Sequence, residues 1–162
     1  MKKVLRKYRE IAKKIDKDIR VKKGFDNWLC WVEDKIIEVA RIETERGEKA
    51  FRKSVIKRLP KEHKDLINII SNEMWSFLHE VGHIEKGRRY WDTPQRTIAE
   101  FLCRHNLDLL GDLIYFNMKE ERKATEWAVR FAIENTDFCL QYTYELCRAY
   151  KNYYQSMGLG KC

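Results

Sequence analysis

The sequence predicts an α+β fold: a single, mostly helical domain with a small antiparallel β-hairpin or sheet near the N-terminus. Apolar residues recur at intervals of three or four over most of the chain, which is typical of helices that bury one face. Between residues 25 and 40 that spacing gives way to runs of strand-forming residues. A length of 162 residues, of which 44% are hydrophobic and 36% charged, suits one globular core. We therefore expect residues 1–162 to form one domain.

The N-terminal part of the chain supplies one helix and the predicted sheet. Residues 3–16 are amphipathic. The face of this helix that we expect to be buried consists of Val4, Tyr8, Ile11 and Ile15. The predicted hairpin at 25–40 has strands at 25–32 and 35–40, and Glu33-Asp34 separates them at a spacing that fits a tight turn. Residues 18–22 are expected to add a third, shorter strand.

From residue 43 onward the pattern is helical to the end of the chain. Pro60 and Gly87 end the first two helices, and Thr93-Pro94 begins the third as an N-cap followed by a proline at the first helical position. Asn117, with Glu120 three residues later, predicts a capping box for the fourth. The helices are expected at about 43–60, 62–86, 94–110, 118–135 and 137–156, the third burying Ile98, Phe101, Leu102 and Leu109.

The formal net charge of +8 is concentrated at the N-terminus. Residues 1–23 carry eleven Lys or Arg against three Asp or Glu, so the other 139 residues are neutral overall. Such a basic segment can contact nucleic acid or an acidic partner. The alternative, favoured by the apolar face of the 3–16 helix, is a solvent-exposed helix surface with no partner.

The N-terminus and the cysteines indicate a cytoplasmic protein. The basic start is not followed by an apolar run, so it does not read as a secretion signal. The five cysteines are odd in number and lack a close pairing motif, which favours free thiols in a reducing compartment. No apolar stretch approaches the roughly 18 residues that a membrane-spanning helix needs.

The pattern with the most chemical content is His79-Glu80-Val81-Gly82-His83. In a helix, residues four apart lie one turn apart on the same face, so His79 and His83 can bind one zinc ion. Glu80 lies beside them and is free to act as a base. Glycine inside a helix costs roughly 1 kcal/mol relative to alanine, so Gly82 indicates the close approach of another backbone.

A catalytic zinc site needs a third protein ligand and an open position for water. Glu121 is the best candidate, because it shares one helix face with three alanines that let two helices approach closely. These are Ala124, Ala128 and Ala132. The alternative for Glu121 is an ordinary acid in the first turn of a helix. Three other residues are weaker candidates for the third ligand. The capping box explains Glu120, and His63 lies about four turns from the motif. His105 is expected to be a core histidine.

With these ligands the sequence predicts hydrolysis of a peptide bond by metal-activated water. Zinc lowers the pKa of a bound water to about 7. Glu80 would accept the proton as the water attacks the carbonyl and would pass it to the leaving amine. Tyr90, His105 and Arg88 are candidate donors to the developing oxyanion, and the sequence does not choose among them. An unpaired edge of the 25–40 hairpin can hold an extended peptide by strand addition.

The His79–His83 motif and the segment Glu121-Arg122-Lys123-Ala124-Thr125-Glu126-Trp127-Ala128 resemble the ImmA/IrrE family of zinc metallopeptidases. That family carries a His-Glu-Leu-Gly-His helix and then a Glu-x-x-Ala-x-x-Phe-Ala helix. The resemblance is stronger over 75–132 than over 1–40. It implies a zincin-like fold, a protein substrate such as a helix-turn-helix repressor, and an origin in a mobile element or stress pathway. It also implies zinc held by His79, His83 and Glu121, with Glu80 as the catalytic base.

Two other function classes stay open. A scaffold of this kind can work by contact alone, as a catalytically silent regulator or inhibitor of a mobile element. Residues 1–23 can bind nucleic acid, although no recognised nucleic-acid motif accompanies them. We expect a zinc endopeptidase that acts on a protein partner in preference to either alternative.

Overall fold

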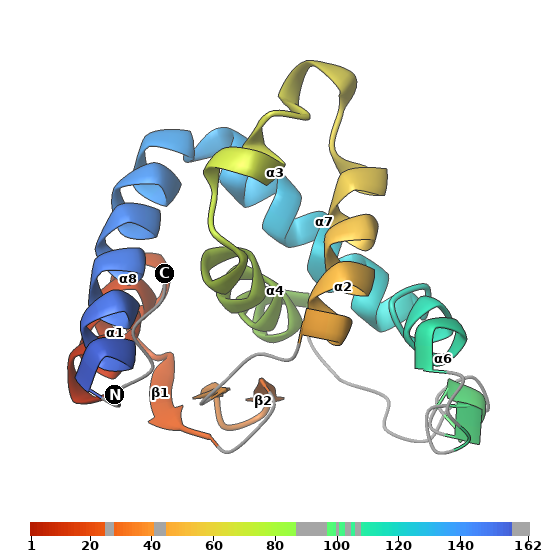
Figure 1. The fold of residues 1–162 in the computed structure, drawn as a ribbon, viewed down its shortest axis with the longest axis horizontal. Helices are drawn as coiled ribbons and strands as arrows, with labels where there is room; N and C mark the ends of the chain where they lie inside the picture. Colours follow the sequence, from red (N-terminus) through yellow and green to blue (C-terminus); the bar gives the residue numbers. More distant parts are fainter. Residues whose placement is uncertain are drawn as a thin grey trace.

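The computed structural model describes residues 1–24, 28–40, 45–86, 97–99, 101–102, 105 and 108–156. Over these ranges the chain is mostly helical with a small three-stranded sheet, which confirms the predicted α+β class. Figure 1 shows α4 (Asn72–Lys86) in the middle of the fold, between α8 (Thr136–Ser156) and α2 (Glu45–Arg58). The helix that carries the His-Glu motif is therefore the central helix.

Helix α1 (Lys2–Ile15) packs against α8 and confirms the predicted N-terminal helix. Its fully buried side chains include Val4, Tyr8 and Ile11. The Tyr8 ring lies 5.0 Å from that of Phe77 on α4 and 5.3 Å from that of Trp28, measured between centroids. The apolar face of α1 thus belongs to the same core as α4.

The sheet is mixed, with strand order β1-β3-β2. The strands are β1 (Arg20–Lys23), β2 (Leu29–Trp31) and β3 (Ile36–Val39). Strands β2 and β3 form the predicted antiparallel hairpin, closed by a turn in which the Lys35 N–H donates to the Val32 carbonyl. β1 pairs with β3 in parallel, so the prediction of a purely antiparallel sheet is wrong. The chain passes from β1 to the far edge as β2 and returns as β3 between the two.

The predicted helix at 62–86 is broken into shorter pieces. These are η1 (Lys61–His63), α3 (Leu66–Ile69) and α4. The Ile70 backbone is extended, with φ −93° and ψ 128°, and ends α3. A new helix follows, in which the Ser71 hydroxyl accepts a hydrogen bond from the Met74 N–H. Ile70 is buried despite the break, so its side chain continues the apolar spacing that suggested one long helix.

The last two predicted helices are confirmed as α7 (Lys119–Glu134) and α8. The prediction for 94–110 is wrong as one continuous helix, because the chain turns at His105 and a separate helix, α6 (Asp108–Tyr115), follows. Ile98 and Phe101 were expected to be buried but are 50% and 58% exposed. Thr93-Pro94, the predicted start of that helix, lies outside the described residues.

Two further observations bear on the class of protein. Among the described residues, no helix combines the length and apolarity that crossing a membrane requires. Cys139 is a buried free thiol, and burial raises its pKa to about 12. A thiol so reluctant to ionise fits a structural role and not a catalytic one.

Candidate metal centre

Helix α4 presents both histidines of the motif on one face, as the spacing of four residues predicts. The Nε2 atoms of His79 and His83 lie 3.2 Å apart, and the two rings meet edge to face. Both side chains are buried, with 5% of His79 and 2% of His83 exposed. Two ring nitrogens therefore converge on one point inside the protein.

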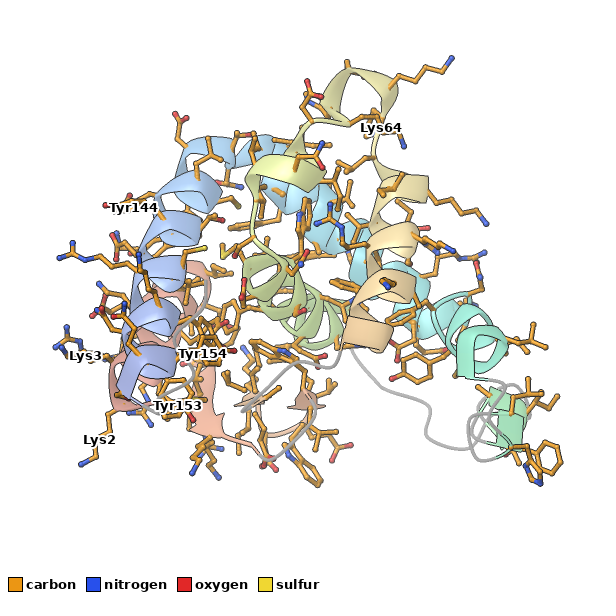
Figure 2. All side chains as sticks on the ribbon, in the orientation of Figure 1. Lys2, Lys3, Lys64, Tyr144, Tyr153 and Tyr154 are labelled. Carbon is orange, nitrogen blue, oxygen red and sulfur yellow. The ribbon has the colours of Figure 1, made fainter. Side chains whose placement is uncertain are left out.

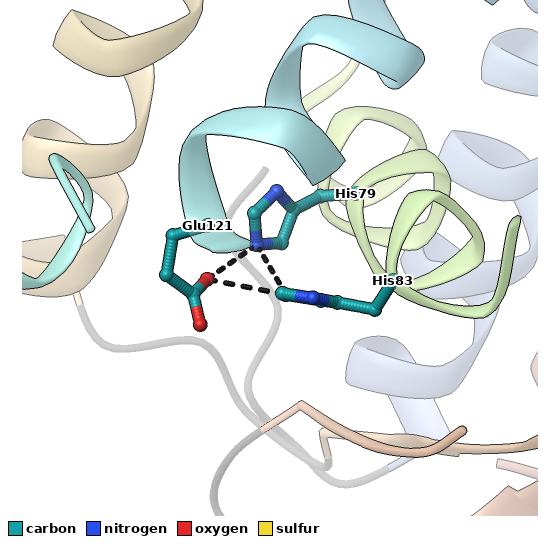
Figure 3. A group of neighbouring side chains, drawn as sticks. All are labelled: His79, His83 and Glu121. Carbon is teal, nitrogen blue, oxygen red and sulfur yellow. Dashed lines mark hydrogen bonds and ion pairs between the residues drawn. The ribbon is translucent and has the colours of Figure 1, made fainter. Parts of the chain in front are cut away.

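Glu121 reaches the same point from the first turn of α7. Its Oε2 atom lies 2.9 Å from His79 Nε2 and 3.2 Å from His83 Nε2 (Figure 3). The three residues offer ligand atoms that all lie within 4.8 Å of one another, so this buried group can hold a metal ion. The structure thus brings together the three residues that the sequence singled out as ligands.

The two ligand-bearing helices are in backbone contact. A Cβ atom on Gly82 would lie 2.4 Å from the carbonyl oxygen of Ala124 on α7, far inside a normal contact. Ala124, Ala128 and Ala132 are all fully buried on the face that carries Glu121. The prediction that Gly82 marks the close approach of another backbone is confirmed, and that backbone is the α7 turn at Ala124.

The start of α7 differs from the predicted capping box. The N-cap is Met118, which makes no side-chain capping hydrogen bond, and the helix begins at Lys119. Asn117 instead belongs to the turn before the helix, where its N–H donates to the Ile114 carbonyl. The capping box of Asn117 and Glu120 is therefore wrong, because backbone hydrogen bonds close this turn. The helix still places Glu121, not Glu120, in the buried group.

Electrostatics keep Glu121 in the form that binds a cation. Burial alone would raise the pKa of this carboxyl, but hydrogen bonds and charge interactions with His79 and His83 hold the pKa well below its usual range. A buried carboxylate that faces two ring nitrogens is a donor set suited to a divalent metal. The chemistry of the three side chains therefore fits a metal ion.

Glu80, the predicted base, is also buried, with 6% of the residue exposed. Its Oε2 atom has no hydrogen-bond partner in the described part of the chain. A buried carboxylate oxygen without a partner is costly and is usually explained by an ion, a water or a reacting group. Glu80, one residue after His79, thus has one buried carboxyl oxygen that no hydrogen bond of the described residues satisfies.

Three residues around His79 were not predicted from the sequence. The rings of Phe51 on α2 and Phe116 after α6 lie 5.2 Å and 6.2 Å from the His79 ring, and form an apolar wall. The Thr125 hydroxyl lies 3.2 Å from His79 Nδ1. Of the three, only Thr125 could have been placed near the site from the sequence, because it follows Glu121 by one helical turn.

Of the remaining candidates, His63 and His105 lie in the described residues, and neither belongs to this group. Tyr90 and Arg88, two of the suggested oxyanion donors, lie outside the described residues. His105 is exposed and stacks on Phe101 with centroids 4.1 Å apart, so the expectation of a core histidine is wrong. His63 is half-buried at the end of η1.

Comparisons of this chain with protein-family models, with curated proteins and with solved structures find no match. The site is therefore described by its own geometry: a buried group of two histidines and one glutamate, contributed by two helices in backbone contact, that can hold a metal ion.

Proposed function

We propose that this protein is a cytoplasmic zinc endopeptidase with a zincin-like site of the ImmA/IrrE type. The main support is the buried group of His79, His83 and Glu121, with Glu80 directly after the first histidine. Two imidazoles and one carboxylate match a known ligand set of catalytic zinc sites, which use three protein ligands and leave one position open. The spacing His-Glu-x-x-His is the one that zinc peptidases use.

The proposed chemistry divides between the ion and Glu80. When bound, zinc would lower the pKa of a coordinated water to about 7 and polarise the carbonyl of the scissile bond. Glu80 would accept the proton of the attacking water and then donate it to the leaving amine. The unpartnered Oε2 atom supports this role, because an oxygen already engaged in the fold would be a weaker proton acceptor.

The proposed substrate is a protein segment in extended conformation. β2 lies at one edge of the described sheet and contacts α4, the helix that carries the site. An edge strand offers backbone groups to which an extended peptide can add. By resemblance, the partner is proposed to be a protein such as a helix-turn-helix repressor.

Zinc is expected to copurify with the protein and to stabilise it. Protein prepared without added metal should contain about one zinc per chain, and chelation followed by zinc addition should raise the free energy of unfolding by about 2.7 kcal/mol at a hundredfold excess over Kd. Metal analysis and urea unfolding measure these effects. His83→Gln should abolish the zinc effect, whereas His63→Gln, outside the group, should preserve it. Equal zinc responses in both variants would contradict the site.

A second candidate function, nucleic-acid binding, rests on the exposed cations of α1. Lys2, Lys3, Arg6, Arg9, Lys13 and Lys14 are all exposed. Figure 2 shows Lys2 and Lys3 pointing away from the fold. The apolar face of α1 is buried in the core, so this helix cannot insert into a membrane surface without unfolding. What remains is a basic surface that suits a phosphate backbone.

If this second function is correct, removing charge from α1 will weaken the salt dependence of binding to a labelled oligonucleotide. The combined change Lys2→Ala, Lys3→Ala and Lys13→Ala should reduce the slope of log K against log salt by about 0.9 for each phosphate of duplex DNA that is no longer neutralised. Fluorescence anisotropy across a salt series measures the slope. Lys49→Ala, Lys53→Ala and Lys57→Ala on α2, all exposed, provide the control. Equal slopes in both triple variants would rule the second function out.

A further inference from the structure

Thr125 joins the two ligand-bearing helices through one hydroxyl group. It is fully buried on α7, one turn after Glu121. The hydroxyl donates to the Glu121 backbone carbonyl at 2.8 Å, and the same oxygen lies 3.2 Å from Nδ1 of His79. Thr125 therefore contacts the backbone of one predicted ligand and the ring of another.

The direction of these hydrogen bonds follows from the chemistry of the groups. A carbonyl oxygen can only accept, so the single proton of the Thr125 hydroxyl is used on Glu121. The hydroxyl oxygen can then only accept from His79, which requires a proton on Nδ1. In a neutral imidazole with the proton on Nδ1, the lone pair is on Nε2. That is the atom that faces Glu121 and His83.

We propose that Thr125 is a positioning residue that holds the His79 ring in the Nδ1–H tautomer and aims its Nε2 lone pair at the metal. The proposal rests on the zinc site proposed above. Metal-binding histidines generally donate their second ring N–H to an acceptor that sets tautomer and orientation. Here the acceptor is a hydroxyl on the helix of another ligand, so the ring and the Glu121 carboxylate are positioned by the same turn of α7.

A threonine with a purely structural role would differ from Thr125 in its hydrogen-bond partners and in the effect of its substitution on zinc binding. Thr136 also donates its hydroxyl to the carbonyl four residues earlier, that of Ala132 at 3.0 Å, but its second partner is the Ile133 carbonyl at 3.1 Å and not a ring of the metal group. If Thr125 were only a helix residue of this kind, valine would replace it with almost the same shape and little consequence for the ion. If Thr125 positions His79, the loss of its hydroxyl will weaken zinc binding.

The experiment compares zinc affinity in Thr125→Val, Thr125→Ser and Thr136→Val by competition with a fluorescent zinc chelator at fixed pH. Thr125→Val should weaken zinc binding about 10–100-fold, as expected for loss of such a partner, while the serine variant and the Thr136 control stay near wild type. Histidine-labelled ¹⁵N NMR of the zinc-loaded protein should show the proton on Nδ1 of His79 in wild type, with loss or broadening of that signal in Thr125→Val. Urea unfolding checks that each variant is folded.

The outcomes separate this inference from the proposed function. If the wild-type protein shows no measurable zinc affinity, both the proposed zinc site and the role of Thr125 are contradicted. Wild-type zinc binding with unchanged affinity in Thr125→Val would overturn the positioning role alone and leave the site intact. Should the valine variant fail to fold, Thr125→Ala, which removes the hydroxyl without adding an apolar branch, decides by the same measurement.

Discussion

Replacing Glu80 by glutamine is expected to lower the rate of peptide cleavage about 10²–10⁴-fold while leaving zinc content unchanged. Glutamine keeps the size of the side chain but cannot accept a proton. Glu80 is buried and directly follows His79, and its Oε2 atom has no hydrogen-bond partner in the described residues, so the substitution breaks no hydrogen bond of that oxygen. Cleavage is measured by mass spectrometry on a proteome-derived peptide library, and zinc content by metal analysis.

Glu85→Gln is the matched control, since Glu85 lies on the same helix but is exposed. It should cleave the library as wild type does. Retention of full activity by Glu80→Gln would contradict the enzyme proposal. Loss of zinc in that variant would make Glu80 a ligand instead of a base. Failure of wild-type protein to cleave any peptide, with zinc bound, would favour the catalytically silent scaffold.

The metal group could be predicted because each of its members obeys a local rule. His79 and His83 follow the period of a helix, which holds wherever the helix lies in the fold. Glu121 is predicted in preference to Glu120 because it shares a helix face with small residues, which allow another backbone to come close. Gly82 supplied the matching signal on the other helix, and the structure places it against Ala124.

The predictions of the fold that proved wrong concern features that local sequence patterns do not determine, such as helix breaks, the burial of a helix face and the direction of strand pairing. Ile70 is buried although its backbone is extended. The apolar spacing therefore continues across the break before Ser71 and does not reveal it. Ile98 and Phe101 have helical spacing, but that spacing does not say whether a face meets the core, and both are exposed. The parallel pairing of β1 with β3 depends on the path of the chain across the sheet and not on the strand residues.

Gly82→Ala is expected to destabilise the protein and to impair zinc binding at the same time. Intrinsic helix propensity alone would favour alanine by about 1 kcal/mol. The new Cβ atom, however, would lie 2.4 Å from the Ala124 carbonyl oxygen, whereas ordinary contact begins at 3.4 Å, so α4 and α7 must separate by about 1 Å. Overpacking of this kind costs typically about 1–3 kcal/mol and outweighs the propensity gain.

The same displacement explains why the metal should be lost. Glu121 precedes Ala124 by one turn, so a shift of α7 moves its carboxylate away from both rings. A shift of about 1 Å exceeds the window of about 0.2 Å within which ligand distances lie in a well-formed metal site. Zinc affinity should therefore fall at least about tenfold, as it does when the residues that orient a ligand are lost. Chelator competition and urea unfolding measure the two effects, with Ser76→Ala on α4 as control. Ala124→Gly should not rescue Gly82→Ala, because the clash is with backbone atoms. A rescued double variant would show that the clash is with the Ala124 side chain instead. Wild-type zinc affinity in Gly82→Ala would show that the helices can part without disturbing the site.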